Sequence, residues 1–170
     1  MNGEEASSAY MNASAIPNDI RRDLVALLPR LRRFALAVTG DALTADALVQ
    51  DVCARAIQKS HHWKGKGRIE SWLFSLIRTA WSDETKKRGN LGPAEIGASQ
   101  SADAHGPATR TLLCLPEGFA GTLLLADVEH FDYAEAASIL GISAELFASR
   151  LCAARLHLSS LPPEPMERRA

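Results

Sequence analysis

Residues 69–81 carry the sequence feature that most constrains the fold. Apolar side chains recur there at spacings of three and four, and polar side chains fill the positions between them. The apolar members are Ile69, Trp72, Leu73, Leu76, Ile77, Ala80 and Trp81. Because this spacing follows the 3.6-residue turn of an α-helix, the segment is predicted to be a helix that buries one stripe. We interpret Trp72 and Trp81 as core residues because both belong to that stripe.

Two further helices are predicted in the first half of the chain. Leu24, Leu27, Leu31 and Phe34 lie on one apolar stripe of a helix that starts near Asp19. Pro29 is expected to kink or divide this helix, because proline has no backbone N–H to donate. The next helix is expected from about Thr44 to Lys59, and a glycine-containing basic loop, residues 61–68, follows it.

The second half predicts shorter helices. One is expected near residues 109–115, and another from Pro116 to about Glu129. Asp132 is predicted to cap a helix that ends at Leu140, and Ser143 to cap a last helix that ends near Ser160. The short helix, the Gly141 turn and the longer helix form a helix-turn-helix pattern. No segment alternates like a strand, so the predicted fold is all-α, with two small helical domains.

The predicted domain organisation has five parts. We expect a flexible leader (1–18), a first helical domain (19–88), a flexible linker rich in Gly, Ala, Ser and Pro (89–108), a helix-turn-helix domain (109–161) and a tail (162–170).

Charge divides the chain more sharply than its net value of −1 suggests. From residue 21 to 88, fourteen Lys and Arg face seven Asp and Glu; from 111 to 161, two Arg face six acids. Because phosphate attracts the basic half and repels the acidic one, nucleic-acid binding is expected mainly in the first half.

Several classes of function are disfavoured by the sequence. No apolar run approaches the roughly 20 residues that span a bilayer, and the polar start lacks the pattern of a signal peptide, so we expect a cytoplasmic protein without membrane contact. The acids have no His, Ser or Cys partner that suggests catalysis, so we expect neither an enzyme nor a small-molecule substrate. No cofactor is expected, and His61 and His62 have no second cluster that would complete a metal site.

The motifs taken in order resemble those of sigma factors of the extracytoplasmic-function (ECF) type, and residues 19–161 carry the resemblance. The matching stretches are 28–35 with 39–41, 46–51, 72–78 with 81–88, 115–117 with 123–129, and 133–142. The general-stress-response branch of the family is the most similar. The resemblance implies a subunit that binds core RNA polymerase, recognises and opens promoter DNA in a stress response, and is held by an anti-sigma factor.

The resemblance also assigns roles to residues. It implies contact with the polymerase by Asp46, Leu48, Val49, Gln50 and Asp51. It implies binding of the −10 promoter element by His62, Trp63, Lys64, Lys66, Arg68, Ser75, Arg78, Ser82 and Lys86. Aromatic rings beside cations suit unstacked bases, although Trp63 is equally compatible with packing. The resemblance implies binding of the −35 element by Ser143, Ser149, Arg150 and Arg155.

The last helix departs from the family pattern. Leu146 stands where a Thr is usual, and Ala148 stands where a Lys or Arg is usual; neither side chain can donate to phosphate or a base edge. Smaller departures are Ala47 for Asp and Thr79 for Asn. Two hypotheses therefore stay open: a working sigma factor with reduced −35 contacts, or a sigma-like protein that acts by binding and sequestering an anti-sigma factor. A repressor that binds duplex DNA alone would leave residues 46–51 unexplained.

Overall fold

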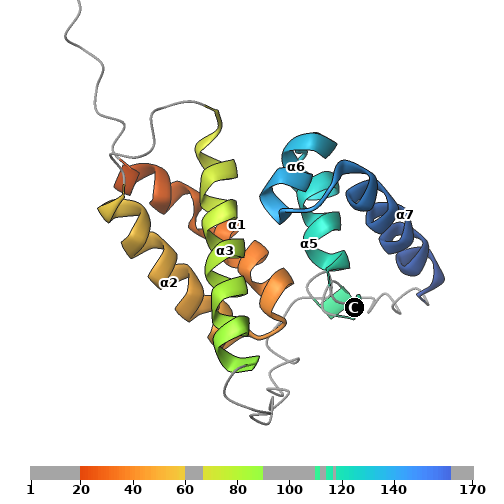
Figure 1. Cartoon of the computed structure of the whole chain (residues 1–170), viewed down its shortest axis with the longest axis horizontal. Helices are drawn as coiled ribbons and strands as arrows, with labels where there is room; N and C mark the ends of the chain where they lie inside the picture. Colours follow the sequence, from red (N-terminus) through yellow and green to blue (C-terminus); the bar gives the residue numbers. More distant parts are fainter. Residues whose placement is uncertain (1–19, 60–66, 90–109, 112–113, 117, 162–170) are drawn as a thin grey trace, which may run out of the picture.

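The computed structural model describes residues 20–59, 67–89, 110, 111, 114–116 and 118–161. All regular structure in these residues is helical, which confirms the all-α prediction. Figure 1 shows the three helices of the first half on the left and the helices of the second half on the right. The predicted leader and tail, and the linker apart from Gly89, lie outside the described residues.

The first half consists of three long helices. They are α1 (Ile20–Thr39), α2 (Ala42–Gln58) and α3 (Ile69–Gly89). The stripe predicted on α3 is the buried one, and its Leu73 and Ile77 are fully inaccessible to solvent together with Phe74. Trp72 and Trp81 are partly buried and pack against the core, as predicted.

Pro29 does not divide α1, so the prediction of a division there is wrong. The helix runs through the proline as one element. Leu27 and Leu31, on either side, are buried in the core. Burying each of these side chains contributes about 1.5–3 kcal/mol, which offsets the roughly 3 kcal/mol that an internal proline costs.

The second helix expected in the second half begins later than predicted. The helix expected from Pro116 starts at Phe119 as α5 (Phe119–Leu123), because Gly118 before it adopts a left-handed conformation with φ 82°. It continues as one π-helical turn, η3 (Leu124–Val128). Of the short helix expected near residues 109–115, Arg110 and Thr111 are helical.

The helix-turn-helix prediction is confirmed in its geometry. Asp132 caps α6 (Tyr133–Leu140), and Ser143 caps α7 (Ala144–Ser160). Gly141 ends α6 with φ 63°, a left-handed conformation in which glycine has no steric penalty. The two helices bend by 96° relative to each other, within the range typical of this motif.

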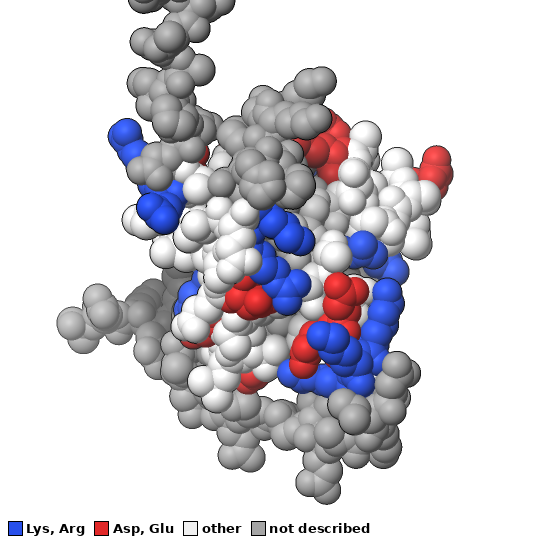
Figure 2. All heavy atoms as spheres, turned by 60° about the vertical axis from the view of Figure 1, so that its left-hand side comes forward, with Lys and Arg blue, Asp and Glu red and all other residues white. Residues whose placement is uncertain are grey.

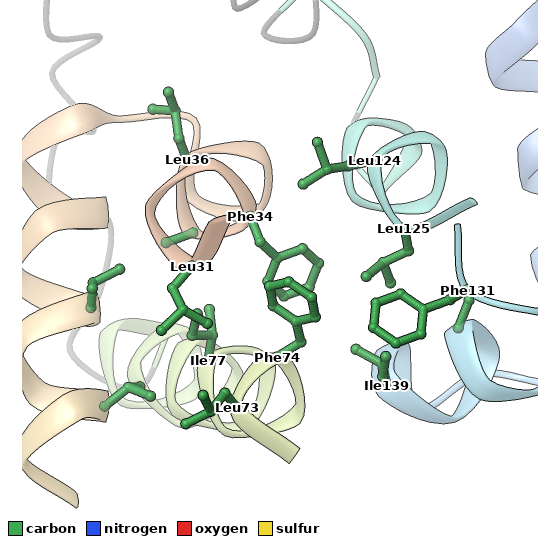
Figure 3. Packing of buried hydrophobic residues seen from close by; sticks show 14 of the residues in the cluster. Leu31, Phe34, Leu36, Leu73, Phe74, Ile77, Leu124, Leu125, Phe131 and Ile139 are labelled. Carbon is green, nitrogen blue, oxygen red and sulfur yellow. The ribbon is translucent and has the colours of Figure 1, made fainter. Parts of the chain in front are cut away.

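The two halves share one core rather than packing separately. Phe74 of α3 lies 4.9 Å from Phe34 of α1 and 5.7 Å from Phe131 of the second half, between ring centroids. Figure 3 shows these rings facing one another, with Leu125 and Ile139 beside Phe131. The buried apolar residues of both halves form one cluster, so removing a ring at its centre affects the whole chain.

We predict that Phe74→Ala lowers the free energy of unfolding by about 3–5 kcal/mol, because it removes a fully buried ring. Chemical denaturation followed by circular dichroism measures this change. The control is Leu43→Ala, since Leu43 is 75% exposed, and it should change stability by less than about 0.5 kcal/mol. Equal losses in the two variants would contradict the shared core.

Candidate functional site

The start of α2 is held by its N-cap. The Asp41 carboxylate accepts hydrogen bonds from the hydroxyl and the backbone N–H of Thr44, at 2.7 and 2.8 Å. These hydrogen bonds lower the pKa of Asp41 below its ordinary value, the bond from the hydroxyl contributing most. The helix therefore begins at Ala42, earlier than the Thr44 expected from the sequence, and residues 46–51 follow in its second and third turns.

Residues 46–51 divide between surface and core. Asp46 accepts from Arg32 at 2.6 and 3.2 Å, and these hydrogen bonds lower the pKa of Asp46. Gln50 and Asp51 are exposed. Leu48 and Val49 are buried, so in this conformation most of each side chain packs in the core. The polar members of the predicted polymerase segment are therefore the accessible ones.

A groove of about 760 Å³ lies between α2 and the last turns of α3. Its lining includes Asp51 of the polymerase segment and Lys86 of the predicted −10 set. Leu43 and Trp81 contribute apolar surface to the same groove. The sequence analysis did not assign Leu43 to a functional surface. The one sequence feature that indicates such a role is its position off the buried stripe of α2.

Charged side chains of both signs line this groove. Asp51 pairs with Arg55 at 2.7 Å, and Glu84 pairs with Arg88 at 3.1 Å. Acidic and basic groups also alternate on the face shown in Figure 2, where the largest basic group, at the lower right, touches acidic atoms. Surface ion pairs of this kind contribute little stability, about 0–1 kcal/mol each. The charged side chains of the groove can therefore exchange these partners for others at little cost.

The residues predicted to bind the −10 element lie in different surroundings. Lys86, near the end of α3, is exposed, and Ser82 is partly exposed. Ser75 is partly buried and donates to the backbone carbonyl of Ser71 at 2.8 Å. The remaining loop members lie outside the described residues: His62, Trp63, Lys64 and Lys66.

Two predicted −10 residues contact the second half. The Arg68 guanidinium lies 4.2 Å from the centroid of the Phe131 ring. The Arg78 guanidinium lies against Gly141, within 2.5–2.7 Å of where a Cβ on that glycine would sit. Both arginines are therefore engaged by residues from the helix-turn-helix half.

Glu129 makes a buried polar contact between the halves. Its side chain is only 2% exposed and accepts from Arg30 Nε at 2.6 Å and from Arg30 Nη2 at 2.5 Å. Arg33 donates to the other carboxylate oxygen at 3.3 Å. Two arginines of α1 therefore hold one carboxylate of the second half.

The π-helical turn η3 leads directly into Glu129. The backbone N–H of Glu129 donates to the carbonyl of Leu124, five residues back, at 2.9 Å, which is the π-helical pattern. In an α-helix the same N–H would donate to the carbonyl oxygen four residues back. The wider turn therefore sets the position from which the Glu129 carboxylate reaches α1.

Ser71 and Glu135 join the halves a second time. The Ser71 hydroxyl donates to the Glu135 carboxylate. The cap predicted at Asp132 is confirmed, because its side chain accepts from the Glu135 N–H at 2.8 Å. In a full capping box the Glu135 side chain would also reach back to the start of α6, whereas here it accepts from Ser71. The contact with α3 replaces the reciprocal cap.

The residues predicted to bind the −35 element are mostly engaged within their own half. Arg155 donates to both carboxylate oxygens of Asp127, at 2.5 and 3.1 Å. The Arg150 guanidinium lies beside Gly118, and the Ser143 hydroxyl accepts from the N–H of residue 146 at 3.2 Å. Ser149 is exposed. In this conformation Arg155 is thus paired with an acid of the same half, and Arg150 lies close to the backbone of that half.

Metal and thiol chemistry find no support in the part of the chain that the structure describes. No group of three or more His, Cys, Asp or Glu is placed there to hold a metal ion. Cys53 is partly buried, and burial raises the pKa of its thiol, which disfavours the reactive thiolate. Within these residues, no single helix is long and apolar enough to cross a membrane.

The fold and these surfaces define a class of protein: an all-helical protein with a helix-turn-helix in its second half. Residues 24–78 match the family model described as the Sigma2 domain of PhyR. The ECF RNA polymerase sigma factor EcfG of Rhodopseudomonas palustris (strain TIE-1) is 29% identical over 156 residues, covering 86% of each chain. The ECF RNA polymerase sigma factor SigM of Bacillus subtilis (strain 168) is 29% identical over 141 residues, covering 76% of this chain and 86% of that one.

A solved structure agrees with these relatives. The sigma factor RpoE, in complex with the anti-sigma factor NepR from Bartonella quintana, superposes with a TM-score of 0.68 at 26% identity. The match covers 83% of this chain and 94% of that one. Over most of its length the chain is similar to ECF RNA polymerase sigma factors and is EcfG-like, which confirms the resemblance seen in its motifs. The family is not enzymatic.

We predict that Asp41→Asn lowers stability near pH 7, because it replaces a charged acceptor at the start of α2 with a neutral one. The folded-state pKa of Asp41 is depressed, so its contribution is present above the unfolded pKa of about 3.9 and is lost as pH falls through the folded value. The difference in melting temperature between wild type and variant should therefore shrink below about pH 4. A difference independent of pH would contradict the role of the charge.

Proposed function

We propose that this chain is a working sigma factor that binds core RNA polymerase and directs recognition and opening of promoters in a stress response. The observation that carries the proposal is the arrangement of α2 and α3, whose accessible polar residues meet at one groove. Similarity to ECF sigma factors, EcfG among them, supports it. The proposal places the protein in the cytoplasm, where core polymerase acts.

The proposed polymerase contact is the accessible side of residues 46–51. Gln50 and Asp51 are exposed there, and Asp46 is held by Arg32. Leu48 and Val49 keep α2 in place through the core. We assign −10 recognition to α3 and to residues 61–68, and we keep the division into domains at 19–88 and 109–161 as part of the proposal.

An anti-sigma factor is the proposed regulatory partner. The RpoE structure from Bartonella quintana contains the anti-sigma factor NepR, and the superposition with RpoE covers most of this chain. From residue 111 to 161 acids exceed arginines, which suits a partner with basic residues.

A second candidate is a sigma-like protein that acts mainly by sequestering an anti-sigma factor. The pairing of Arg155 on α7 with Asp127 favours it, because this pairing withdraws one of the two arginines of that helix from DNA. A helix that offers little charge to phosphate binds DNA weakly. Similarity of residues 24–78 to the Sigma2 domain of PhyR is compatible with either candidate.

Promoter-dependent runoff transcription with core polymerase separates the two candidates. We predict that Arg78→Ala combined with Lys64→Ala reduces promoter opening by at least about tenfold while core binding changes little, since both cations are assigned to DNA. Permanganate footprinting measures opening, and co-elution with core polymerase measures binding. An equal loss of core binding would contradict the assignment, and no transcript from wild type would favour sequestration.

The −35 contact has its own test. We predict that Ala148→Arg strengthens binding to −35 duplex DNA about fivefold or more, because one added phosphate contact is worth roughly 1 kcal/mol. The matched control is Ala134→Arg, on the exposed surface of α6. Fluorescence anisotropy with the polymerase holoenzyme measures both. Equal effects of the two substitutions would mean that α7 does not enter the groove.

A further inference from the structure

The ion pair between Arg32 of α1 and Asp46 of α2 lies at the start of the segment proposed to contact the polymerase. Arg32 Nε donates to Asp46 Oδ1 at 2.6 Å, and Arg32 Nη2 donates to Asp46 Oδ2 at 3.2 Å. Two nitrogens of one guanidinium therefore hold both oxygens of one carboxylate. Because the guanidinium is planar and rigid, such a pair of hydrogen bonds fixes the orientation of the carboxylate as well as its position.

Stability does not account for this ion pair. The side chains of Arg32 and Asp46 are 53% and 43% exposed. An exposed ion pair contributes about 0–1 kcal/mol to the free energy of unfolding. Helices α1 and α2 are instead held together by buried apolar side chains, among them Leu31 and Val52. What the ion pair determines is the direction in which the Asp46 carboxylate faces solvent.

Asp46 shares one face of α2 with Gln50. The two residues are four positions apart, so their side chains are neighbours on the helix surface. Asp51, the next residue, forms an ion pair with Arg55 at 2.7 Å. Both acids of residues 46–51 are therefore already neutralised by arginines of this chain. A surface without net charge attracts a partner only weakly from a distance, so its affinity depends on the geometry of its close contacts.

The Asp46 carboxylate can accept more hydrogen bonds than Arg32 supplies. An ionised carboxylate has about four lone-pair positions, and the two bonds from Arg32 leave the others available. The hydrogen bonds from Arg32 lower the pKa of Asp46, which keeps it ionised near neutral pH. Glu129 shows this capacity in the same chain, because its carboxylate accepts from both Arg30 and Arg33. A donor from another molecule can therefore bind Asp46 while Arg32 holds it.

We propose that Arg32 is a positioning residue of the polymerase contact: it orients the Asp46 carboxylate to accept a hydrogen bond from a cationic side chain of core polymerase. Arg32 acts through Asp46 and does not itself touch the polymerase. The inference rests on the proposed function and deepens it, since the motifs assign residues 46–51 to the polymerase and give no role to Arg32.

A double-mutant cycle tests whether Arg32 acts through Asp46. Fluorescence anisotropy of the full chain, labelled with fluorescein at its N-terminus, measures the dissociation constant for core RNA polymerase. We expect Arg32→Ala and Asp46→Ala each to weaken binding about five- to tenfold. In the Asp46→Ala background, adding Arg32→Ala should change the dissociation constant by less than about twofold, because no carboxylate is left to orient.

Two further variants separate geometry from charge. Arg32→Lys keeps the positive charge but replaces the planar guanidinium with a single ammonium group, so we expect binding at least about threefold weaker than that of wild type. Arg22→Ala removes the same charge from another exposed position on α1, and its affinity should stay within about twofold of wild type. Thermal unfolding followed by circular dichroism verifies that each variant is folded at the temperature of the measurement.

Each contrary result overturns the proposal at a different point. If Arg32→Ala binds as tightly as Arg22→Ala, Arg32 has no part in the contact. If its loss persists in the Asp46→Ala background, Arg32 touches the polymerase directly and is not a positioning residue. If Arg32→Lys binds like wild type, the paired geometry is not required. A wild-type chain that does not bind core polymerase refutes the proposed function and this inference with it, whereas equal binding by wild type and Arg32→Ala refutes this inference alone.

Discussion

The buried carboxylate of Glu129 is the constraint on which the arrangement of the two halves depends. A carboxylate that is 2% exposed is costly unless it is paired, and Arg30 and Arg33 provide the pairing. Both arginines come from α1, so satisfying Glu129 requires the second half to dock on the first. The apolar contacts around Phe131 then follow from the same docking.

Helix α3 serves both halves at once. One side, with Leu73 and Ile77, completes the three-helix core of the first half. Another side, with Ser71 and Arg78, meets the helix-turn-helix half at α6 and Gly141. The helix assigned to −10 recognition is therefore partly covered in this conformation.

Sequence periodicity predicted the helices well because it reports local burial. The stripe on α3 and the caps Asp132 and Ser143 are found as predicted. Of the kink or division predicted at Pro29, the division does not occur: the cost of the proline is local, whereas the burial that offsets it comes from the packing of α1 against α2 and α3. The π-helical turn at η3 was also missed, since an extra residue in one turn leaves no distinct pattern.

The candidate sites were less predictable than the fold. Motifs identified residues 46–51, but only packing distinguishes the exposed Gln50 and Asp51 from the buried Leu48 and Val49. The resemblance assigned Arg155 to DNA, whereas in this conformation Asp127, 28 residues earlier, engages it. Pairings of this kind join residues far apart in the chain, so spacing along the sequence carries little information about them.

Most of the helices and the caps Asp132 and Ser143 could be read from the sequence, because they depend on residues within a few turns of one another. The order of the family motifs and the charge difference between the halves are properties of the sequence itself. The contact of the halves through Glu129, the pairing of Arg155 with Asp127 and the groove between α2 and α3 became visible only in the folded chain. The physical reason is that these features require side chains from distant segments to meet.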